Sequence, residues 1–95
     1  MNELNGKHAI VTGGGHGIGE SIARALYKSG AKVTITGRNI EKLTATAHSM
    51  PGCNRYTLDI SDEDAVANVF DILTKAHGPA DILINNAGIA GSAPF

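Results

Sequence analysis

The sequence predicts an α/β fold in which a parallel sheet is doubly wound by helices. Four short segments rich in β-branched and aliphatic residues alternate along the chain with three segments whose apolar residues recur at helical spacing. Glycine or proline separates most neighbouring segments. Strands that alternate with helices pair in parallel through right-handed crossovers. The order β-α-β-α-β-α-β therefore gives half of a doubly wound sheet, with an expected strand order of 3-2-1-4.

The first strand is expected at Lys7–Thr12, a short aliphatic run that leads into a cluster of glycines. The first helix is predicted by residues that recur at helical spacing, namely Ile18, Ile22, Ala25, Leu26 and Ser29. Gly30 ends that helix. The second strand is expected at Lys32–Thr36, which is rich in β-branched residues and is followed by Gly37.

A second helix is predicted by an apolar stripe of Ile40, Leu43, Ala47 and Met50. Pro51-Gly52 breaks this helix, and a weaker third strand is expected at Asn54–Leu58. Ser61 followed by Asp64 resembles a capping box at the start of the third helix.

The third helix is predicted by the stripe of Val66, Val69, Phe70 and Leu73, and Gly78-Pro79 terminates it. The fourth strand is expected at Asp81–Asn85. Gly88–Phe95 shows no periodicity, and we expect this segment to fray.

Composition excludes several classes of function. A chain of 95 residues makes one domain. A net charge of −1 and a pI of about 6.4 give no electrostatic support for binding nucleic acid or a membrane surface. The longest apolar runs have three residues, as at Ala9-Ile10-Val11, whereas a membrane-spanning helix needs about 20.

Cysteine and histidine usage points to neither disulfides nor a metal. The single cysteine, Cys53, cannot form an internal disulfide, which fits a reducing, cytoplasmic setting. Cys53 follows a Pro-Gly turn and is a candidate for an exposed thiol, with nothing nearby to activate it. His8, His48 and His77 lie too far apart along the chain for a local metal motif.

The glycine cluster is the first indication of function. Five of the 12 glycines fall within Gly13–Gly19, between the first strand and the first helix. Free backbone N–H groups and the helix dipole favour an anion there, typically a pyrophosphate, and glycine leaves room for its close approach. A flexible turn is the alternative interpretation, which the position before an amphipathic helix disfavours. A Walker-type loop is excluded, because no Gly-Lys-Ser/Thr follows.

Three motifs then occur in order at the ends of three expected strands. They are Thr12-Gly13-x-x-x-Gly17-x-Gly19, Asp59-Ile60 and Asn85-Asn86-Ala87-Gly88. Together they resemble the classical short-chain dehydrogenases/reductases, most closely the 3-oxoacyl-carrier-protein reductases. The resemblance covers about Lys7 to Gly91 and implies a single dinucleotide-binding domain of the Rossmann type over residues 1–95, incomplete relative to the family.

The resemblance implies that a nicotinamide dinucleotide lies on the glycine loop. The loop residues it assigns to the cofactor are Gly13, Gly15, His16, Gly17, Ile18 and Gly19. After the second strand stands Arg38, with no acidic residue before Glu41. An arginine there accepts the 2′-phosphate of NADP, whereas a carboxylate would bind the 2′-hydroxyl of NAD. We therefore expect NADP(H) rather than NAD(H). His16 adds a possible donor for the phosphate. In the alternative interpretation, Arg38 and His16 are ordinary surface residues.

Further roles follow from the resemblance alone. Asp59 would accept a hydrogen bond from the adenine amino group, and Ile60 would pack beside the ring. In the alternative, Asp59 is an ordinary acid ahead of a helix. The backbone of Asn86, Ala87 and Gly88 would approach the ribose on the nicotinamide side, while the asparagine side chains brace the central strands. Asn85 is assigned the structural part of this motif.

The family's catalytic serine and Tyr-x-x-x-Lys pair have no counterparts in this sequence. Four residues after Tyr27 stands Ala31, and four after Tyr56 stands Ile60, so no catalytic residue is assigned. Three hypotheses remain open. The chain is the NADP(H)-binding part of an oxidoreductase acting on carbonyls or alcohols and inactive alone, or a non-catalytic nucleotide-binding or subunit-pairing module, or a self-associating remnant that binds no cofactor.

The topology also predicts self-association. The fourth strand would form an open edge with the apolar residues Ile82, Leu83 and Ile84. Crossover handedness puts the first two helices on one face of the sheet and only the third on the other. We therefore expect a homo-oligomer that buries the fourth-strand edge or the less covered face.

Overall fold

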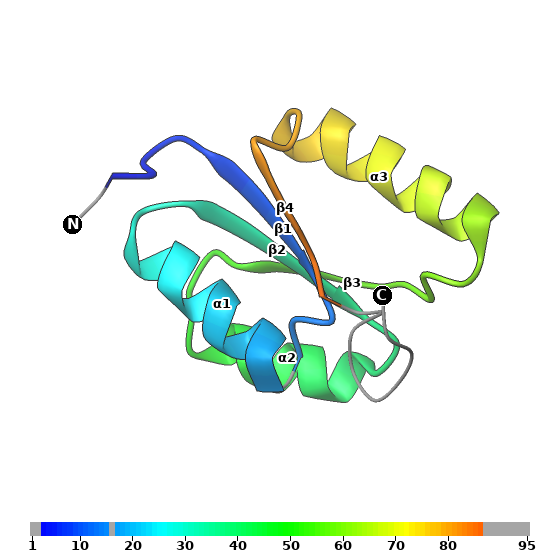
Figure 1. The fold of residues 1–95 in the computed structure, drawn as a ribbon, viewed down its shortest axis with the longest axis horizontal. Helices are drawn as coiled ribbons and strands as arrows, with labels where there is room; N and C mark the ends of the chain where they lie inside the picture. The colour runs from blue at the N-terminus through cyan, green and yellow to red at the C-terminus, as the bar shows by residue number, and fades with distance from the viewer. Residues whose placement is uncertain (1–2, 16, 87–95) are drawn as a thin grey trace.

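The computed structural model describes residues 3–15 and 17–86 (Figure 1). Strands and helices alternate through this part of the chain in the order β1 (His8–Thr12), α1 (Gly17–Lys28), β2 (Lys32–Gly37), α2 (Ile40–His48), β3 (Asn54–Thr57), α3 (Glu63–His77) and β4 (Ile82–Asn85). The four strands form one parallel sheet in the order β3-β2-β1-β4. The predicted α/β fold and strand order are confirmed. The expectations for His16 and for residues 87–95 lie outside the described residues.

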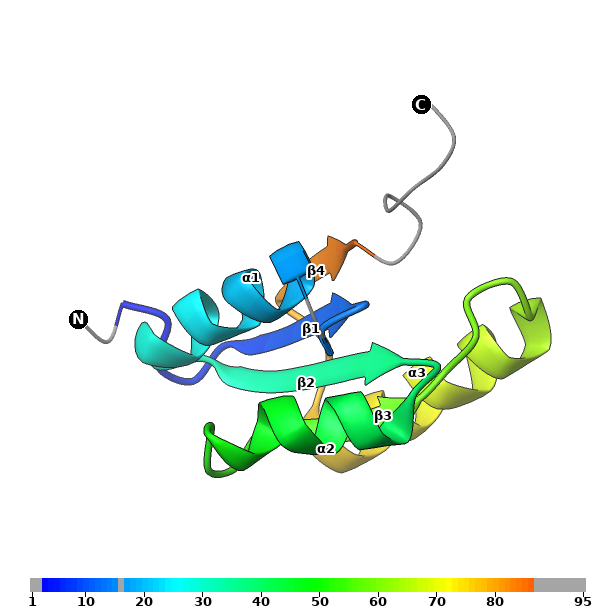
Figure 2. The ribbon, with the colours of Figure 1, turned by 90° about the horizontal axis from the view of Figure 1, so that it is seen from below.

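The molecule has three layers, with the sheet in the middle. Helices α1 and α2 lie on one face of the sheet and α3 lies on the other (Figures 1 and 2). This arrangement follows from right-handed crossovers on both sides of β1, where the direction of winding reverses. The predicted distribution of helices between the two faces is confirmed.

The face under α1 and α2 is apolar. Alternate strand residues point to the same face, and the register places Val11 of β1 beside Ile35 of β2 and Ile84 of β4. Strands β1 and β2, the two helices and the loops beside them contribute a buried cluster, against which Ile84 of β4 packs. Its members are Ala9, Val11, Ala23, Ala31, Val33, Ile35, Leu43, Ala47, Met50 and Cys53. Burial of this cluster is the main apolar contribution to the stability of the fold.

The buried position of Cys53 corrects the expectation of an exposed thiol. The residue is buried and belongs to the apolar cluster. Its Sγ donates a weak hydrogen bond to the Asn54 carbonyl at 3.6 Å. Burial raises the pKa of the Cys53 thiol to about 11, although the charge of Arg55 acts in the opposite direction. The thiol is therefore neutral and unreactive at physiological pH.

The cap of α3 and the exposure of Ile40 in α2 differ from what the sequence predicts. Asp62, not Ser61, caps α3, and its side chain accepts a hydrogen bond from Ala65 N at 3.0 Å. Ser61 is not free to act as the cap, because its hydroxyl donates to Asp59 Oδ1 at 2.7 Å. In α2, Ile40 is 47% exposed although its predicted stripe partner Leu43 is buried. Ile40 is the first residue of the helix and follows shortly after β2 ends at Gly37.

Candidate dinucleotide site at the carboxyl edge of the sheet

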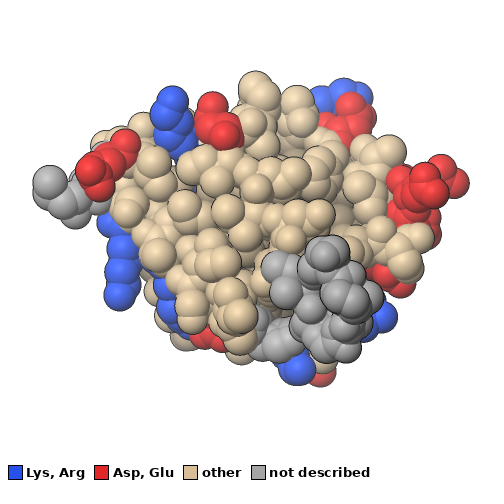
Figure 3. All heavy atoms as spheres, in the orientation of Figure 1, with Lys and Arg blue, Asp and Glu red and all other residues tan. Residues whose placement is uncertain are grey.

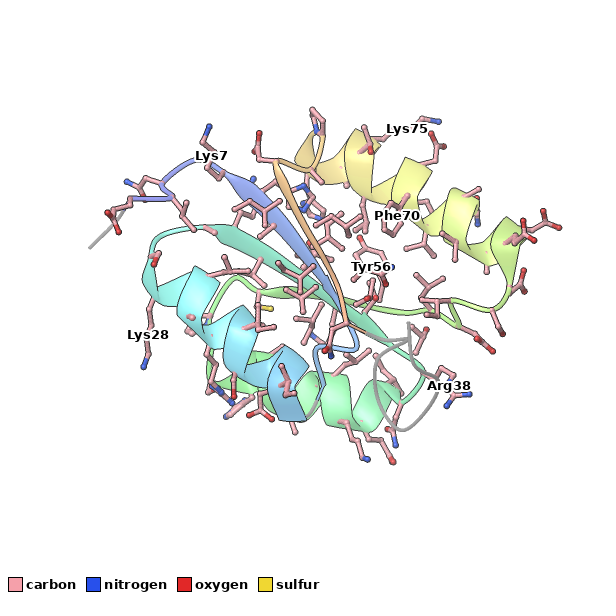
Figure 4. All side chains as sticks on the ribbon, in the orientation of Figure 1. Lys7, Lys28, Arg38, Tyr56, Phe70 and Lys75 are labelled. Carbon is pink, nitrogen blue, oxygen red and sulfur yellow. The ribbon has the colours of Figure 1, made fainter. Side chains whose placement is uncertain are left out.

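The carboxyl ends of parallel strands meet at one edge of the sheet, and the predicted site residues follow those ends. The glycine loop follows β1, Arg38 follows β2, Asp59 follows β3 and Asn86 follows β4. Figure 4 shows Arg38 at this edge, with its side chain extending away from the body of the domain. In open α/β sheets, ligands bind outside these strand ends, where the strand order reverses. Here the order reverses between β1 and β4.

The glycine loop crosses closely over the end of β2. Gly13 N and Gly14 N both donate to the Thr36 carbonyl, at 2.7 and 3.2 Å. A Cβ placed on Gly14 would lie 2.6 Å from Ile35 Cγ2. No side chain fits there without moving β2, so Gly14 is required by packing. Gly14 was not among the predicted site residues.

Close packing and backbone conformation account for the other loop glycines. A Cβ on Gly19 would lie 2.1 Å from Gly13 O and 2.6 Å from Asn86 Nδ2, so α1 can approach the loop only with glycine at this position. Gly17 has a φ of +61° and open space around it. Glycine is therefore favoured at this position because the backbone is left-handed, and not because a Cβ would clash with a neighbour. Gly17 begins α1, whose first N–H groups face the carboxyl edge of the sheet.

A hydrogen-bond network joins the loop to β4. Thr12 Oγ1 lies 3.2 Å from Asn85 Oδ1 and 3.3 Å from Ile84 O, and it accepts a hydrogen bond from Asn86 N at 2.9 Å. Asn86 Nδ2 donates to Gly13 O at 3.3 Å. These contacts give the asparagines the bracing geometry expected from the motif, with Asn86 reaching the loop itself.

Arg38 and Asp59 both line an open depression. The depression has a volume of about 350 Å³ and is lined by Arg38, Thr57, Leu58, Asp59 and Ala65. Hydrogen bonds from the Ser61 hydroxyl and backbone N–H hold the pKa of Asp59 below its usual range, and the Arg38 guanidinium adds to this effect. Both Ser61 bonds end on Oδ1. Within the described residues, Oδ2 accepts no hydrogen bond and Arg38 forms no ion pair, so both groups are available to a ligand.

The comparison with protein families identifies this arrangement. A family profile described as "short chain dehydrogenase" matches residues 7–95. The chain belongs to the short-chain dehydrogenase family. The recognition made from the three motifs is confirmed at the level of the family, and nothing singles out the 3-oxoacyl-carrier-protein reductases within it.

Individual relatives of this short-chain dehydrogenase chain show the same likeness. It is 39% identical over 96 residues to gluconate 5-dehydrogenase of Gluconobacter oxydans (strain 621H), covering 97% of this chain and 38% of that protein. It is 45% identical over 94 residues to the NADP-dependent (R)-specific alcohol dehydrogenase of Lentilactobacillus kefiri, covering 96% and 37%.

Among solved structures, a metagenomic short-chain oxidoreductase in complex with NADP superimposes with a TM-score of 0.87 at 40% identity, covering 92% of this chain and 41% of that one. The chain thus spans about two-fifths of these proteins.

Sequence reasoning assigned Ile18 and Ile60 to the site of this short-chain dehydrogenase but missed Ile40 and Thr46. Large exposed apolar side chains follow three of the strands, at Ile18, Ile40 and Ile60, which are 68%, 47% and 38% exposed. Ile40 was assigned only to a helix stripe, although its position directly after Arg38-Asn39 was a signal that it lies at the edge. Thr46 contacts Gly15 in the loop although the two residues are 31 positions apart in sequence, and no local motif predicts such a contact.

Three predicted site residues, His16, Ala87 and Gly88, lie outside the described part of the chain. Within residues 3–15 and 17–86, no helix is long and apolar enough to cross a membrane. The same part of the chain holds no group of three or more histidine, cysteine, aspartate and glutamate side chains that could bind a metal ion.

Proposed function

We propose that this chain is the NADP(H)-binding part of a short-chain dehydrogenase acting on carbonyl or alcohol substrates, and that it does not turn over substrate by itself. The observation that carries the proposal is the pair of available groups beside one depression, Arg38 at the end of β2 and Asp59 after β3. An arginine without an ion-pair partner suits the 2′-phosphate that distinguishes NADP from NAD. The NADP-dependent relative and the NADP complex support this choice.

Each predicted residue has a role in this proposal. The pyrophosphate lies on the loop and first turn of α1, against Gly13, Gly15, His16, Gly17, Ile18 and Gly19. Asp59 Oδ2 accepts a hydrogen bond from the adenine amino group, and Ile60 packs beside the adenine ring. Asn86, Ala87 and Gly88 approach the ribose on the nicotinamide side. When bound, the nicotinamide would donate or accept a hydride.

The chain's own contribution to the chemistry is binding and orientation. Glycines in the loop let phosphate oxygens reach backbone N–H groups, and the Thr12–Asn86 network holds the loop against β4. No residue here is assigned to move a proton, so reduction of a carbonyl would need an acid from elsewhere. Two finer points remain part of the proposal. They are membership of the group that resembles the 3-oxoacyl-carrier-protein reductases, and the cytoplasm as the compartment.

The direct test is a titration of the 95-residue chain with NADPH and, separately, with NADH. Cofactor fluorescence can be followed cleanly because the chain has no tryptophan. We expect saturable binding with NADPH the tighter ligand, and no oxidation of NADPH when carbonyl compounds are added. Absence of saturable binding by either cofactor would overturn the proposal and favour the hypothesis of a remnant without cofactor.

A substitution sharpens the assignment of Arg38. Arg38→Asp replaces the phosphate acceptor with a carboxylate that repels a 2′-phosphate and can bind a 2′-hydroxyl. We expect the ratio of NADPH to NADH affinity to fall by about tenfold or more, the order expected for losing a charge-assisted hydrogen bond and adding a like charge. Lys28→Asp, on the exposed last turn of α1, is the matched charge control. An unchanged ratio in Arg38→Asp would refute the role of Arg38.

Self-association is a second proposal, and it rests on the β4 edge. Leu83 is 52% exposed on this edge strand, and β1 is the only described strand that pairs with β4. On the face seen in Figure 3, the surface in front of β4 is formed by uncharged residues, while charged side chains lie around it. An uncharged strand edge favours pairing with another strand. We propose a homodimer or larger oligomer. A monodisperse monomer at micromolar concentration in light scattering would contradict this, and Leu83→Lys should shift an oligomer toward monomer.

A further inference from the structure

Thr46 of α2 makes a buried contact with the glycine loop. The side chain is 4% exposed, and its Oγ1 donates to the Gly15 carbonyl at 2.9 Å. The same part of α2 packs against the loop, since a Cβ on Gly15 would lie 3.4 Å from Leu43 Cδ2 and 3.4 Å from Lys42 Cβ. The middle of the loop therefore packs directly on α2. The Thr46 hydroxyl supplies the hydrogen bond from α2 to the Gly15 carbonyl.

The direction of this hydrogen bond is not the default for a threonine inside a helix. Such hydroxyls commonly donate to the carbonyl four residues earlier in the same helix. Thr74 of α3 does so, donating to Phe70 O at 2.9 Å. Thr46 donates instead to a carbonyl 31 residues away. Its hydroxyl thus acts between elements and not within its own helix.

The Gly15 carbonyl matters because of where the other loop contacts lie. Gly13 N and Gly14 N are held by Thr36 O, and Gly13 O is held by Asn86 Nδ2. Thr46 supplies the next fixed point along the loop. A carbonyl oxygen carries partial negative charge and would repel a phosphate if it turned toward the ligand side. Thr46 holds this oxygen on the α2 side and so leaves the ligand side to N–H donors.

We propose that Thr46 is a positioning residue for the dinucleotide, acting through the Gly15 carbonyl to keep the glycine loop in the shape that accepts the cofactor. This inference rests on the proposed function. Because Thr46 acts on the loop, which would hold the part common to NADPH and NADH, it affects both cofactors alike. Arg38 differs, since its proposed role concerns only the 2′-phosphate.

The test compares three variants for binding of NADPH and NADH and for unfolding in urea. Thr46→Val keeps the shape of the side chain and removes the hydroxyl, and Thr46→Ser keeps the hydroxyl. Thr44→Val makes the same change in the same helix at an exposed residue whose hydroxyl accepts from Arg55 Nε. We expect Thr46→Val to raise the Kd of both cofactors about five- to tenfold, the order of one lost hydrogen bond. Thr46→Ser should restore binding to within about twofold, and Thr44→Val should leave it unchanged.

The outcomes separate this inference from the proposed function. If the wild-type chain binds neither cofactor, the proposed function fails and the role of Thr46 fails with it. If the wild type binds and the folded Thr46→Val variant binds equally well, only the role of Thr46 is refuted. A change in the NADPH-to-NADH ratio, or weak binding in Thr46→Ser, also refutes it. Should Thr46→Val not fold, Thr46→Ala takes its place. Hydrogen exchange of the Gly14 amide can then be measured without cofactor. We expect this exchange to be faster in the variant than in the wild type, and an unchanged rate would contradict the inference.

Discussion

The two faces of the sheet are packed in different ways. Toward α1 and α2, the central strands present aliphatic side chains such as Val11 and Ile35, which seal an apolar cluster. Toward α3, the same strands present His8, Thr34 and Thr36 beside the aliphatic Ile10, all buried. The backbone of α3 also approaches the sheet less closely than those of α1 and α2. The first face is thus stabilised by apolar burial, while the second buries apolar side chains such as Ile10 and Leu73 and must also satisfy buried polar groups.

The polar face satisfies most of its groups but not all of them. His8 Nδ1 lies 3.1 Å from the Gly78 carbonyl, which can only accept, so Nδ1 carries a proton. In the neutral ring Nε2 then accepts from the Thr34 hydroxyl, also at 3.1 Å. Within the described residues, Thr36 Oγ1 and His77 Nε2 are buried without a partner. Figure 4 shows Tyr56 and Phe70 filling the space between the sheet and α3. The α3 face therefore leaves buried polar atoms without hydrogen bonds in the described part of the chain.

The largest effect is expected on the apolar face. Leu43 is 1% exposed, and its side chain also lies beneath Gly15 and Gly37. Leu43→Ala should lower the free energy of unfolding by about 2–5 kcal/mol, because it leaves a cavity in a packed core. Urea denaturation followed by circular dichroism measures this. The matched variant Leu73→Ala removes a fully buried leucine from α3. If Leu73→Ala proved the costlier change, our ranking of the two faces would be wrong.

A smaller effect of opposite sign is expected on the polar face. Thr36 is fully buried and its hydroxyl has no hydrogen-bond partner among the described residues. Thr36→Val keeps the shape of the side chain and removes the unsatisfied group, so the free energy of unfolding should rise by about 1 kcal/mol. Thr34→Val is the matched control in the same strand. It removes a hydroxyl that is bonded to His8, and it should destabilise the fold. Equal effects of the two substitutions would show that the hydrogen bonding does not decide stability here.

The fold and the strand-end residues could be predicted from the sequence, whereas contacts between distant residues could not. The alternation of strands and helices was sufficient for the parallel sheet and its order, because crossover handedness leaves few alternatives. The glycine loop, Arg38 and Asp59 could be proposed as site residues because each follows a strand end in sequence. In contrast, the contacts of Thr46 with Gly15 and of His8 with Gly78 join residues 31 and 70 positions apart, with no local pattern. Ser61 was predicted as the cap in place of Asp62, because the sequence does not show that the Ser61 hydroxyl donates its hydrogen bond to Asp59.

The smallest effect concerns pH and again separates the two faces. The ring of His77 in α3 lies against that of His8, with centroids 5.8 Å apart. Burial lowers the pKa of His77, and the charges of His8 and Lys32 add to the shift. An unfolded histidine titrates near pH 6.5. Below that pH the unfolded chain takes up a proton that the native chain resists, so the free energy of unfolding falls as the solution is acidified.

His77→Gln should therefore reduce the loss of stability between about pH 7.5 and pH 5.5, because it removes the group whose pKa differs between the two states. Urea midpoints measured across this range test the prediction. His48→Gln, exposed at the end of α2 on the apolar face, is the matched control and should leave the pH dependence in place. If His77→Gln and the wild type lost stability in parallel on acidification, the pH sensitivity would not originate at the α3 face. If His77→Gln lost less stability than the wild type on acidification, the pH sensitivity would originate where α3 packs against β1.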